Sequence, residues 1–469
     1  MKGELTRLTA TELSTSYADG SLSPVEATRA ALEQIDRLDG STHAFVLVDV
    51  EGAVAAAEES EARWREGRQR GPADGIPTSI KDIFLTRGWP TLRGSELIDP
   101  SGPWPDDAPC VARLREAGAV FLGKTSTPEF AWKGVTDSRR FGATGNPWDA
   151  SRTSGGSSGG SATAVGLGMC AWSMGTDGGG SVRIPAAFTG TVALKPTYGL
   201  VSLYPASPFG TLSHAGPMTR SVTDAATLLD VVSGFDHRDW SAMPTPTGSF
   251  LTGLEGGVAG LRIGFSATLG YVDNDPEVET LVRAAVGVLA DRGAIVEEVD
   301  PGFTDPIDAF DVLWQSGAAK VAEAYGAEAL DRIDPGLRRV VEAGAQLTAS
   351  DFLDATAVRM DLGLRMGEFH RRHDLLVTPT LPITAFPTGT DAPAGSLSPD
   401  WTSWTPYTYP FNMTQQPALS IPCGLTGAGL PVGLQIVGAR HADALVLRAG
   451  RAYESATTWN DLVPTLAQS

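Results

Sequence analysis

The stretch Thr153-Ser-Gly-Gly-Ser-Ser-Gly-Gly-Ser161, together with Gly175-Thr-Asp-Gly-Gly-Gly-Ser-Val-Arg183 downstream, is the most informative part of this chain. In each segment a serine, Ser157 or Ser181, follows a pair of glycines. Glycine permits backbone conformations that other residues resist, and successive N–H groups in such turns form concavities that bind anions. A serine beside such N–H groups predicts a nucleophile next to an oxyanion hole.

The simplest alternative for the first segment is a flexible Gly/Ser linker. The segment runs directly into 162–170, however, and that stretch has the composition of a buried element. This continuity favours a folded turn.

Length and composition bound the class of protein. A chain of 469 residues suits one large α/β domain or about two or three smaller ones. The hydrophobic fraction of 42% and charged fraction of 19% are typical of a soluble globular protein. The net charge of −19 disfavours nucleic acid as a partner, because phosphate binding needs clustered Lys and Arg. Since the chain has no apolar run of about 18 residues and no signal-peptide pattern, we expect no membrane span and a cytoplasmic protein.

Cysteine and histidine usage does not support a disulfide framework or a metal site. Cys110, Cys170 and Cys423 lie far apart and form no C-x-x-C motif. His370 and His373 have a spacing that two ligands on a helix could use, but the glutamate of an H-E-x-x-H motif is missing. We therefore expect no metal.

Strand and helix patterns alternate along the chain, which predicts an α/β core around a mixed sheet. Ser23-Pro24 predicts a helix start, because serine is a favoured N-cap and proline suits the first helical turn. Before residue 237 the expected helices are 8–38 with a break at 21–24, 51–69, 111–118, 161–171 and 223–233, and the expected strands are 78–85, 119–123 and 192–196.

The segment 237–370 has a different character and is mainly helical over 308–358. Because no long polar linker divides the chain, we expect a single domain over 1–469, with a catalytic α/β core formed by 60–235 and 372–458. The segment 237–370 is then a variable insertion that shapes the substrate site. Further expected elements are strands 261–265, 294–299, 374–379 and 429–438 (the last as a strand or hairpin), helices 276–292 and 443–454, and a loop over 381–410.

A serine nucleophile needs a base. The sequence offers three catalytic arrangements: a serine with His214 as base, a cysteine nucleophile, or a serine with Lys81 as base. His214 would give a histidine-based hydrolase. A G-x-S-x-G pattern occurs at Gly155–Gly159, but a nucleophile elbow needs a strand running straight into it, and 146–152 resembles a loop. A catalytic cysteine would need a reactive setting, which none of the three cysteines has. The third candidate is Lys81.

Lys81 is flanked by Ile80, Ile83 and Phe84. Burial among such neighbours disfavours the charged ammonium, so the amine could act as a general base near neutral pH. The alternative is a lysine with a buried stem and a hydrated head, paired with Asp82. Phosphate-binding motifs fit the glycine tract poorly, because a P-loop requires G-K-[ST] and a dinucleotide fingerprint requires a leading strand.

Five kinds of motif follow one another along the chain. They are Gly75-Ile-Pro-Thr-Ser-Ile-Lys81-Asp, the two glycine segments, Leu194-Lys-Pro-Thr-Tyr-Gly-Leu200, His214-Ala-Gly-Pro-Met-Thr-Arg-Ser-Val222 and Pro431-Val-Gly-Leu-Gln-Ile-Val-Gly438. In this order they resemble the amidase signature family, and the similarity covers roughly 5–235 and 372–458.

The resemblance implies a Ser–cisSer–Lys triad. Ser181 would be the nucleophile, Ser157 the bridging serine after a cis bond from Gly156, and Lys81 the base. The implied oxyanion hole consists of the backbone N–H groups of Gly178, Gly179, Gly180 and Ser181, and the implied supporting residues are Ser158, Asp177 and Arg183.

The family also implies a fold and a reaction. The fold would be a mixed β-sheet covered by helices on both faces. The reaction would be hydrolysis of a carboxamide through an acyl-enzyme, without a metal or an organic cofactor.

Aromatic residues on loops favour an apolar or aryl amide as substrate, since they can form an apolar pocket wall. Aryl carbamates and esters share the same chemistry. The expected partner is a small-molecule amide, and the sequence leaves open whether the chain forms a homodimer. The candidate pocket residues are Phe130, Trp132, Trp314, Trp401 and Trp404.

Two alternatives are kept. One is the glutamine-hydrolysing component of a tRNA-dependent amidotransferase, which resembles the same family and would work beside another subunit. The other is a binding protein of the same fold without catalytic activity. The presence of Lys81, Ser157 and Ser181 argues against this alternative.

Overall fold

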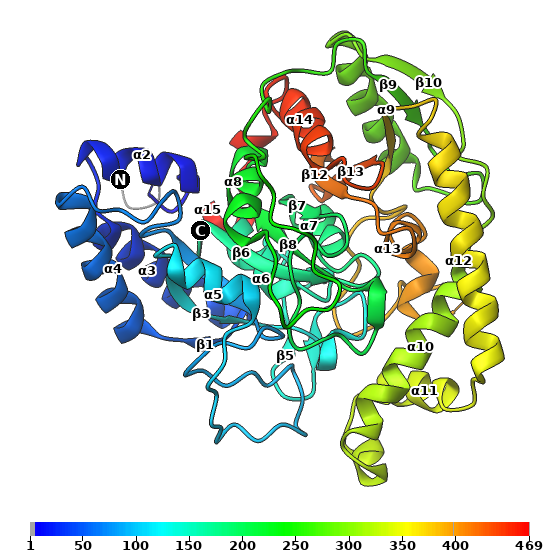
Figure 1. Ribbon diagram of the computed structural model, residues 1–469, viewed down its shortest axis with the longest axis horizontal. Coiled ribbons are helices and arrows are strands. Elements are labelled where there is room, and N and C mark those ends of the chain that lie inside the picture. The colour runs from blue at the N-terminus through cyan, green and yellow to red at the C-terminus, as the bar shows by residue number, and fades with distance from the viewer. Residues whose placement is uncertain (1–4, 397, 469) are drawn as a thin grey trace.

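A large mixed β-sheet runs through the whole molecule (Figure 1). The computed structural model describes residues 5–396 and 398–468. Within them eleven strands form one sheet in the order β1-β3-β2-β6-β8-β7-β12-β13-β11-β9-β10, and β4 and β5 form a separate hairpin. The strands are β1 Phe45–Val48, β2 Pro77–Lys81, β3 Val120–Thr125, β4 Asp137–Ser138, β5 Gly142–Ala143, β6 Trp172–Asp177, β7 Val192–Lys195, β8 His214–Thr219, β9 Arg262–Phe265, β10 Ile295–Glu298, β11 Leu375–Pro379, β12 Ala418–Leu425 and β13 Pro431–Gly438.

The helices begin at local signals in the sequence. The predicted start at Ser23 is confirmed, because its hydroxyl accepts the Glu26 N–H and the Glu26 carboxylate accepts the Ser23 N–H. None of the helices in the described ranges is long and apolar enough to cross a membrane. The α-helices are α2 Ala10–Asp19, α3 Pro24–Thr42, α4 Val50–Arg65, α5 Pro109–Glu116, α6 Gly159–Gly166, α7 Arg183–Thr189, α8 Val222–Val232, α9 Pro276–Asp291, α10 Ile307–Glu323, α11 Pro335–Gly344, α12 Ala349–Phe369, α13 Tyr409–Met413, α14 Asp443–Glu454 and α15 Thr465–Gln468.

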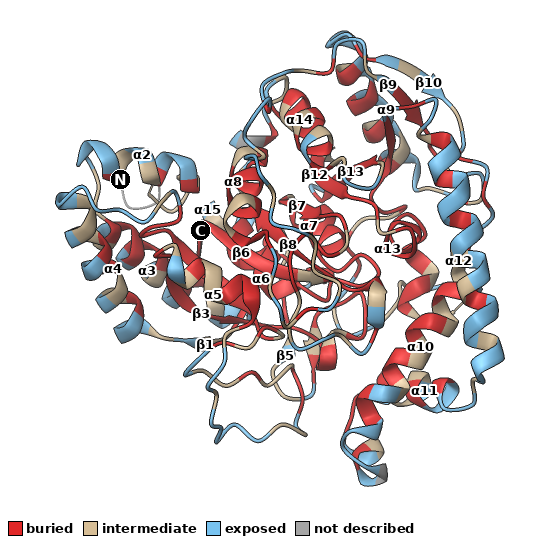
Figure 2. Ribbon diagram, in the orientation of Figure 1, coloured by how far each residue is buried: buried red, intermediate tan, exposed pale blue. Residues whose placement is uncertain are grey.

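Helices cover both faces of the sheet because successive strand residues point to opposite sides. On β11, Leu375 and Val377 join a core with α2, α5, α8, α9 and α14, whereas Leu376 joins a second core with α7 and α10–α13. A third core unites α3, α4 and α6. Figure 2 shows the strands largely buried and the outer side of α12 exposed. The predicted fold, an α/β domain with helices on both faces of a mixed sheet, is confirmed.

The central strands β6 and β8 escaped the sequence analysis, as did β12 and the edge strand β1. β6 reads Trp-Ser-Met-Gly-Thr-Asp and β8 reads His-Ala-Gly-Pro-Met-Thr, so both contain residues that are depleted in strands. They pair with each other in antiparallel register, with Pro217 opposite Met174. Burial between two helix layers outweighs the weak local propensity.

The segment 237–370 is not purely helical. It supplies β9 and β10, which extend one edge of the main sheet beyond β11, before the chain continues into α10, α11 and α12. The division into a catalytic core and an insertion stays a prediction, and the two strands β9 and β10 belong structurally to the main sheet.

Candidate active site

Lys81 and the Thr176–Asp177 pair lie at the same end of two neighbouring strands of the sheet. Lys81 is the last residue of β2, and Asp177 is the last residue of β6, which runs parallel to β2 as its neighbour. The carboxyl ends of parallel strands are the usual place for a site in an α/β sheet. Ser157 lies just before the start of α6, and Ser181 follows β6 by four residues. The loops that carry these two serines therefore lie at the same end of the strands as Lys81.

The glycine tract is closely packed against the core. A Cβ on Gly156 would lie 2.4 Å from the carbonyl carbon of Val135, and one on Gly160 would lie 2.4 Å from the Ser126 hydroxyl. Gly180 has φ +136°, where side chains are strained. The Gly156–Ser157 peptide bond is cis. These contacts exclude the flexible-linker interpretation, because glycine is required here for close approach.

The Lys81 side-chain nitrogen lies among three hydroxyl groups. Nζ is 2.7 Å from Ser157 Oγ, 2.9 Å from Ser158 Oγ and 2.7 Å from Thr176 Oγ1. The side chain is fully buried, with 0% exposure. Burial lowers the pKa of Lys81 well below its usual value, although the Asp177 carboxylate pulls the pKa upward. The environment therefore favours the neutral amine.

The surrounding hydrogen bonds indicate which hydroxyl gives its proton to that amine. The Ser158 hydroxyl donates to the Thr176 carbonyl at 3.1 Å, so Ser158 Oγ is left to accept from Lys81. A neutral amine has two N–H donors and one lone pair. If the donors go to Ser158 and Thr176, the lone pair is available to the Ser157 hydroxyl.

His214 lies near the site but in a different set of contacts. Its Nδ1 is 2.8 Å from the Leu212 carbonyl oxygen and 3.2 Å from the Asp177 carbonyl oxygen, and its Nε2 is 3.4 Å from Lys195 Nζ. Burial and the neighbouring Lys195 lower the pKa of His214 well below its usual value. Within the described residues neither ring nitrogen contacts a serine hydroxyl, so this geometry does not support His214 as the base.

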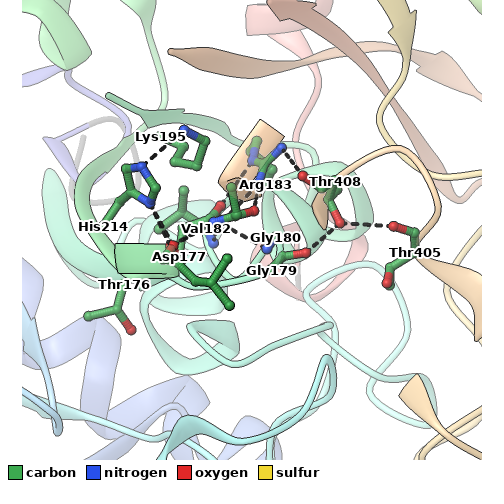
Figure 3. A network of polar contacts seen from close by, with 12 residues as sticks. Thr176, Asp177, Gly179, Gly180, Val182, Arg183, Lys195, His214, Thr405 and Thr408 are labelled. Atoms are coloured by element: carbon green, nitrogen blue, oxygen red, sulfur yellow. Dashed lines mark hydrogen bonds and ion pairs between the residues drawn. The ribbon is translucent and has the colours of Figure 1, made fainter. Parts of the chain in front are cut away.

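Asp177 and Arg183 hold the loop that carries Ser181 (Figure 3). Both side chains are completely buried, and Arg183 Nε and Nη2 each lie 3.0 Å from an Asp177 carboxylate oxygen. Asn412 donates to the same carboxylate at 2.8 Å. Burial would raise the pKa of Asp177, but the attraction of Arg183 prevails and holds the pKa below its usual value. The expected supporting pair is therefore present as a buried ion pair.

One peptide of the glycine loop is fixed from both ends, as Figure 3 shows. The Gly180 N–H donates to Asp177 Oδ1 at 2.8 Å, and the Gly179 carbonyl oxygen accepts from Thr408 Oγ1 at 2.6 Å. This corrects the predicted oxyanion hole, because the Gly180 N–H is occupied by Asp177. Among the described residues, the N–H groups of Gly178, Gly179 and Ser181 have no protein acceptor.

A cavity of about 270 Å³ opens beside these serines. Ser157, Thr176 and Ser181 line it, so these polar groups face the interior of the cavity. Two aromatic pairs contribute to its wall. Phe209 and Trp314 stack with ring centroids 3.9 Å apart, and Phe130 and Tyr325 are 5.4 Å apart. The further apolar lining consists of Ile83, Phe84, Ala131, Leu203, Tyr204, Pro205, Ala206, Pro208, Val321 and Ala324.

The five residues predicted for the pocket divide into two groups. Phe130 and Trp314 line the cavity, whereas Trp132, Trp401 and Trp404 do not. These three tryptophans are buried in the core between α7 and α10–α13, where aromatic side chains fill the space between layers. Trp401 lies so close behind the glycine loop that a Cβ on Gly179 would be 2.5 Å from its ring.

The sequence analysis missed the segment 203–209 as part of the site. Tyr204, Pro205 and Phe209 line the cavity, and the Tyr204–Pro205 bond is cis. A signal was present, since Leu203-Tyr-Pro-Ala-Ser-Pro-Phe209 is rich in proline and aromatic residues and closely follows the motif at 194–200.

Comparison with known proteins gives a consistent family assignment. The model of the family described as Amidase matches residues 26–447. The chain is 37% identical to the glutamyl-tRNA(Gln) amidotransferase A subunit of Chloroflexus aggregans, over 99% of this chain and 100% of that protein. It is 36% identical to an acylamidase of Rhodococcus erythropolis, over 97% of each chain. Its structure resembles that of a bacterial aryl acylamidase of the amidase signature family, with a TM-score of 0.90, 29% identity and 97% coverage of both chains.

Proposed function

This chain belongs to the Amidase family of enzymes that act on amide bonds, and from this premise we propose that it hydrolyses an apolar or aryl amide through a Ser181 acyl-enzyme. Aryl carbamates and esters are included in the proposed substrate range. The observation that carries the proposal is the 2.7 Å contact between Lys81 Nζ and Ser157 Oγ, next to Ser181 in an aromatic cavity.

The proposed reaction begins with proton transfer through two hydroxyls. Neutral Lys81 takes the proton of Ser157, and Ser157 takes that of Ser181 as the Ser181 oxygen attacks the amide carbonyl. The developing oxyanion is stabilised by the free N–H groups of Gly178, Gly179 and Ser181, each typically worth about 100- to 1000-fold in rate. The proton then passes to the leaving amine. Water releases the acid by the same relay.

The cavity wall supports the apolar or aryl part of the proposal. The Phe209–Trp314 and Phe130–Tyr325 pairs present ring surface to a bound molecule, and aromatic groups pack favourably on such surfaces. Apolar pockets with a few placed polar groups are typical of small-molecule sites.

The alternative is the glutamine-hydrolysing component of a tRNA-dependent amidotransferase. It is favoured by the names of several relatives at 35–39% identity, which are glutamyl-tRNA(Gln) amidotransferase A subunits. Such an enzyme would bind a polar amino acid and work with partner subunits, so its activity on free glutamine would depend on copurifying proteins.

A substrate panel separates the two candidates. The panel contains an aryl anilide, an aryl carbamate, a short aliphatic amide and glutamine, and each is tested with wild type, Ser181→Ala and Ser161→Ala. Ser161 is a buried serine of the same tract that bonds Thr125 and does not line the cavity, so its variant is the matched control. We expect turnover of the aryl substrates that is lost only in Ser181→Ala. Preference for glutamine would support the amidotransferase component, and absence of fluorophosphonate labelling at Ser181 would support a silent binding protein.

A further inference from the structure

The charge of the cavity lining is opposite to that of the protein. The chain has a net charge of −19. Among the described residues that line the cavity, however, Arg93 and Lys320 are cationic and none is Asp or Glu. A cavity with this lining attracts an anionic group and offers no carboxylate to a positively charged one.

The two cations differ in what they have available to bind. Lys320 is 70% exposed and is already paired with Glu323 on the same helix. Arg93 is partly buried, and within the described residues its guanidinium has no acceptor. Other partly buried arginines have acceptors: Arg63 binds Asp74, and Arg115 binds Asp107. An arginine has five N–H donors, so the Arg93 side chain is left with capacity to bind a ligand.

The backbone around Arg93 connects it to another part of the cavity wall. Arg93, Phe130 and Ala131 all line the cavity, and all three have positive φ, at 52°, 51° and 60°. The Phe130 N–H donates to the Arg93 carbonyl at 2.8 Å, and the Arg93 N–H donates to the Asp82 carbonyl at 3.1 Å. Non-glycine residues in this conformation are uncommon and cluster at functional sites. The two turns are thus fixed to each other at the cavity.

We propose that the substrate carries an anionic oxygen group, such as a carboxylate, which binds the Arg93 guanidinium while its aromatic or apolar body lies against Phe130 and Tyr325. This inference rests on the proposed function and names its substrate class. A planar guanidinium matches a carboxylate through two parallel charge-assisted hydrogen bonds. The scissile amide of the same molecule then lies at Ser181.

The same lining separates an acid from a free amino acid. Glutamine carries an α-ammonium as well as an α-carboxylate. Because the described lining contains no Asp or Glu, the ammonium would enter the cavity without a countercharge, which is costly in a partly desolvated site. The inference therefore favours an anionic amide over a zwitterion.

The test compares two anilides that differ only in charge, one with a para-carboxylate and one with a para-methyl group on the ring. Values of kcat/KM are measured for wild type, Arg93→Met, Arg93→Lys and the control Arg65→Met. Arg65 is an exposed arginine on α4, paired with Glu61, and its variant changes the net charge equally. We expect wild type and Arg65→Met to prefer the carboxylate by about tenfold or more, which is about 1.4 kcal/mol. Arg93→Met loses the preference, mainly through KM, and Arg93→Lys keeps part of it. An unchanged preference in Arg93→Met overturns the inference.

A binding measurement keeps the inference separate from the proposed function. The Ser181→Ala variant is titrated with 4-acetamidobenzoate and with its neutral methyl analogue, with and without Arg93→Met. Tighter binding of the carboxylate that disappears with Arg93→Met supports anion recognition even if turnover fails. Equal binding of both compounds contradicts it even if the aryl amide is hydrolysed. Thermal melting of each variant verifies that the fold is intact.

Discussion

Lys81 Nζ lies 2.7 Å from Ser157 Oγ, at the carboxyl end of the buried strand β2. Because burial lowers the pKa of Lys81 well below that of a free lysine, the amine becomes neutral at a lower pH than usual. Only the neutral amine can accept the Ser157 proton. We therefore expect kcat/KM to fall as pH decreases through the lowered pKa, and to be constant above it.

The pH profile of Lys81→Met checks this assignment. Loss of a general base typically costs about 100- to 10,000-fold, and the residual activity should lack the acid limb. The circular dichroism spectrum serves as the control for folding. Should the acid limb persist in Lys81→Met and vanish in His214→Asn, the base would be His214 instead.

Thr408 positions the glycine loop from a segment far away in the sequence. Its hydroxyl donates to the Gly179 carbonyl at 2.6 Å, which fixes the peptide between Gly179 and Gly180. We expect Thr408→Val to reduce kcat by about tenfold with little change in KM, because the loop stabilises the oxyanion only in the transition state. The matched control is Thr405→Val, a buried threonine whose hydroxyl contacts carbonyls of its own turn. Equal losses in both variants would indicate general disruption of the loop.

The buried Asp177–Arg183 ion pair stabilises the folded protein, and its contribution changes with pH in a defined direction. Removing one partner leaves the other charge buried and unpaired, so Asp177→Asn should lower the free energy of unfolding by about 3–5 kcal/mol at pH 7. Because the folded-state pKa of Asp177 is lowered, its contribution is present above the unfolded-state pKa and is lost as pH falls through the folded one.

Urea denaturation of the single and double variants measures this effect. Asp177→Asn combined with Arg183→Met should lose less than the sum of the two single losses, since the second change removes the unpaired charge. Additive losses would mean that the two side chains act independently.

Lys133 contacts three carboxylates, one of which is the N-cap of α11. Its Nζ lies 2.6 Å from Asp137, 3.2 Å from Asp334 and 2.7 Å from Asp391, and Asp334 is the N-cap of α11. Burial alone would lower the pKa of Lys133, but the three aspartates raise it above its usual value, so the ammonium is charged at neutral pH. We expect Lys133→Met to speed amide exchange over Pro335–Gly344 by about tenfold or more.

The control for this variant is Lys320→Met. Lys320 forms an exposed pair with Glu323, and such pairs contribute little to stability. Exchange in α11 that is unchanged by Lys133→Met would show that packing alone holds the helix.

The glycine spacing singled out Ser157 and Ser181, and the alternation of strands and helices predicted the α/β class, whereas the roles of nucleophile, bridging serine and base were implied by the family resemblance. Gly-Gly-Ser at 155–157 and 179–181 is a local signal, since glycine is demanded by close approach at Gly156 and by a positive φ at Gly180. Helix starts such as Ser23 were likewise predictable, because capping involves residues only three positions apart. These features depend on short stretches of chain and are therefore visible in the sequence.

Tertiary structure decided which groups face the cavity and which support it from behind. Trp401 and Trp404 looked like pocket residues but pack in the core, while Phe209 and Arg93 line the site from loops that carry no catalytic residue. The Gly180 N–H looked like an oxyanion donor but is occupied by Asp177. Contacts with segments far away in the sequence set the directions of these side chains. The fold of its own loop sets the direction of the Gly180 N–H. The spacing of residues along the chain determines which reactive groups are available, and tertiary packing determines the direction in which those groups point.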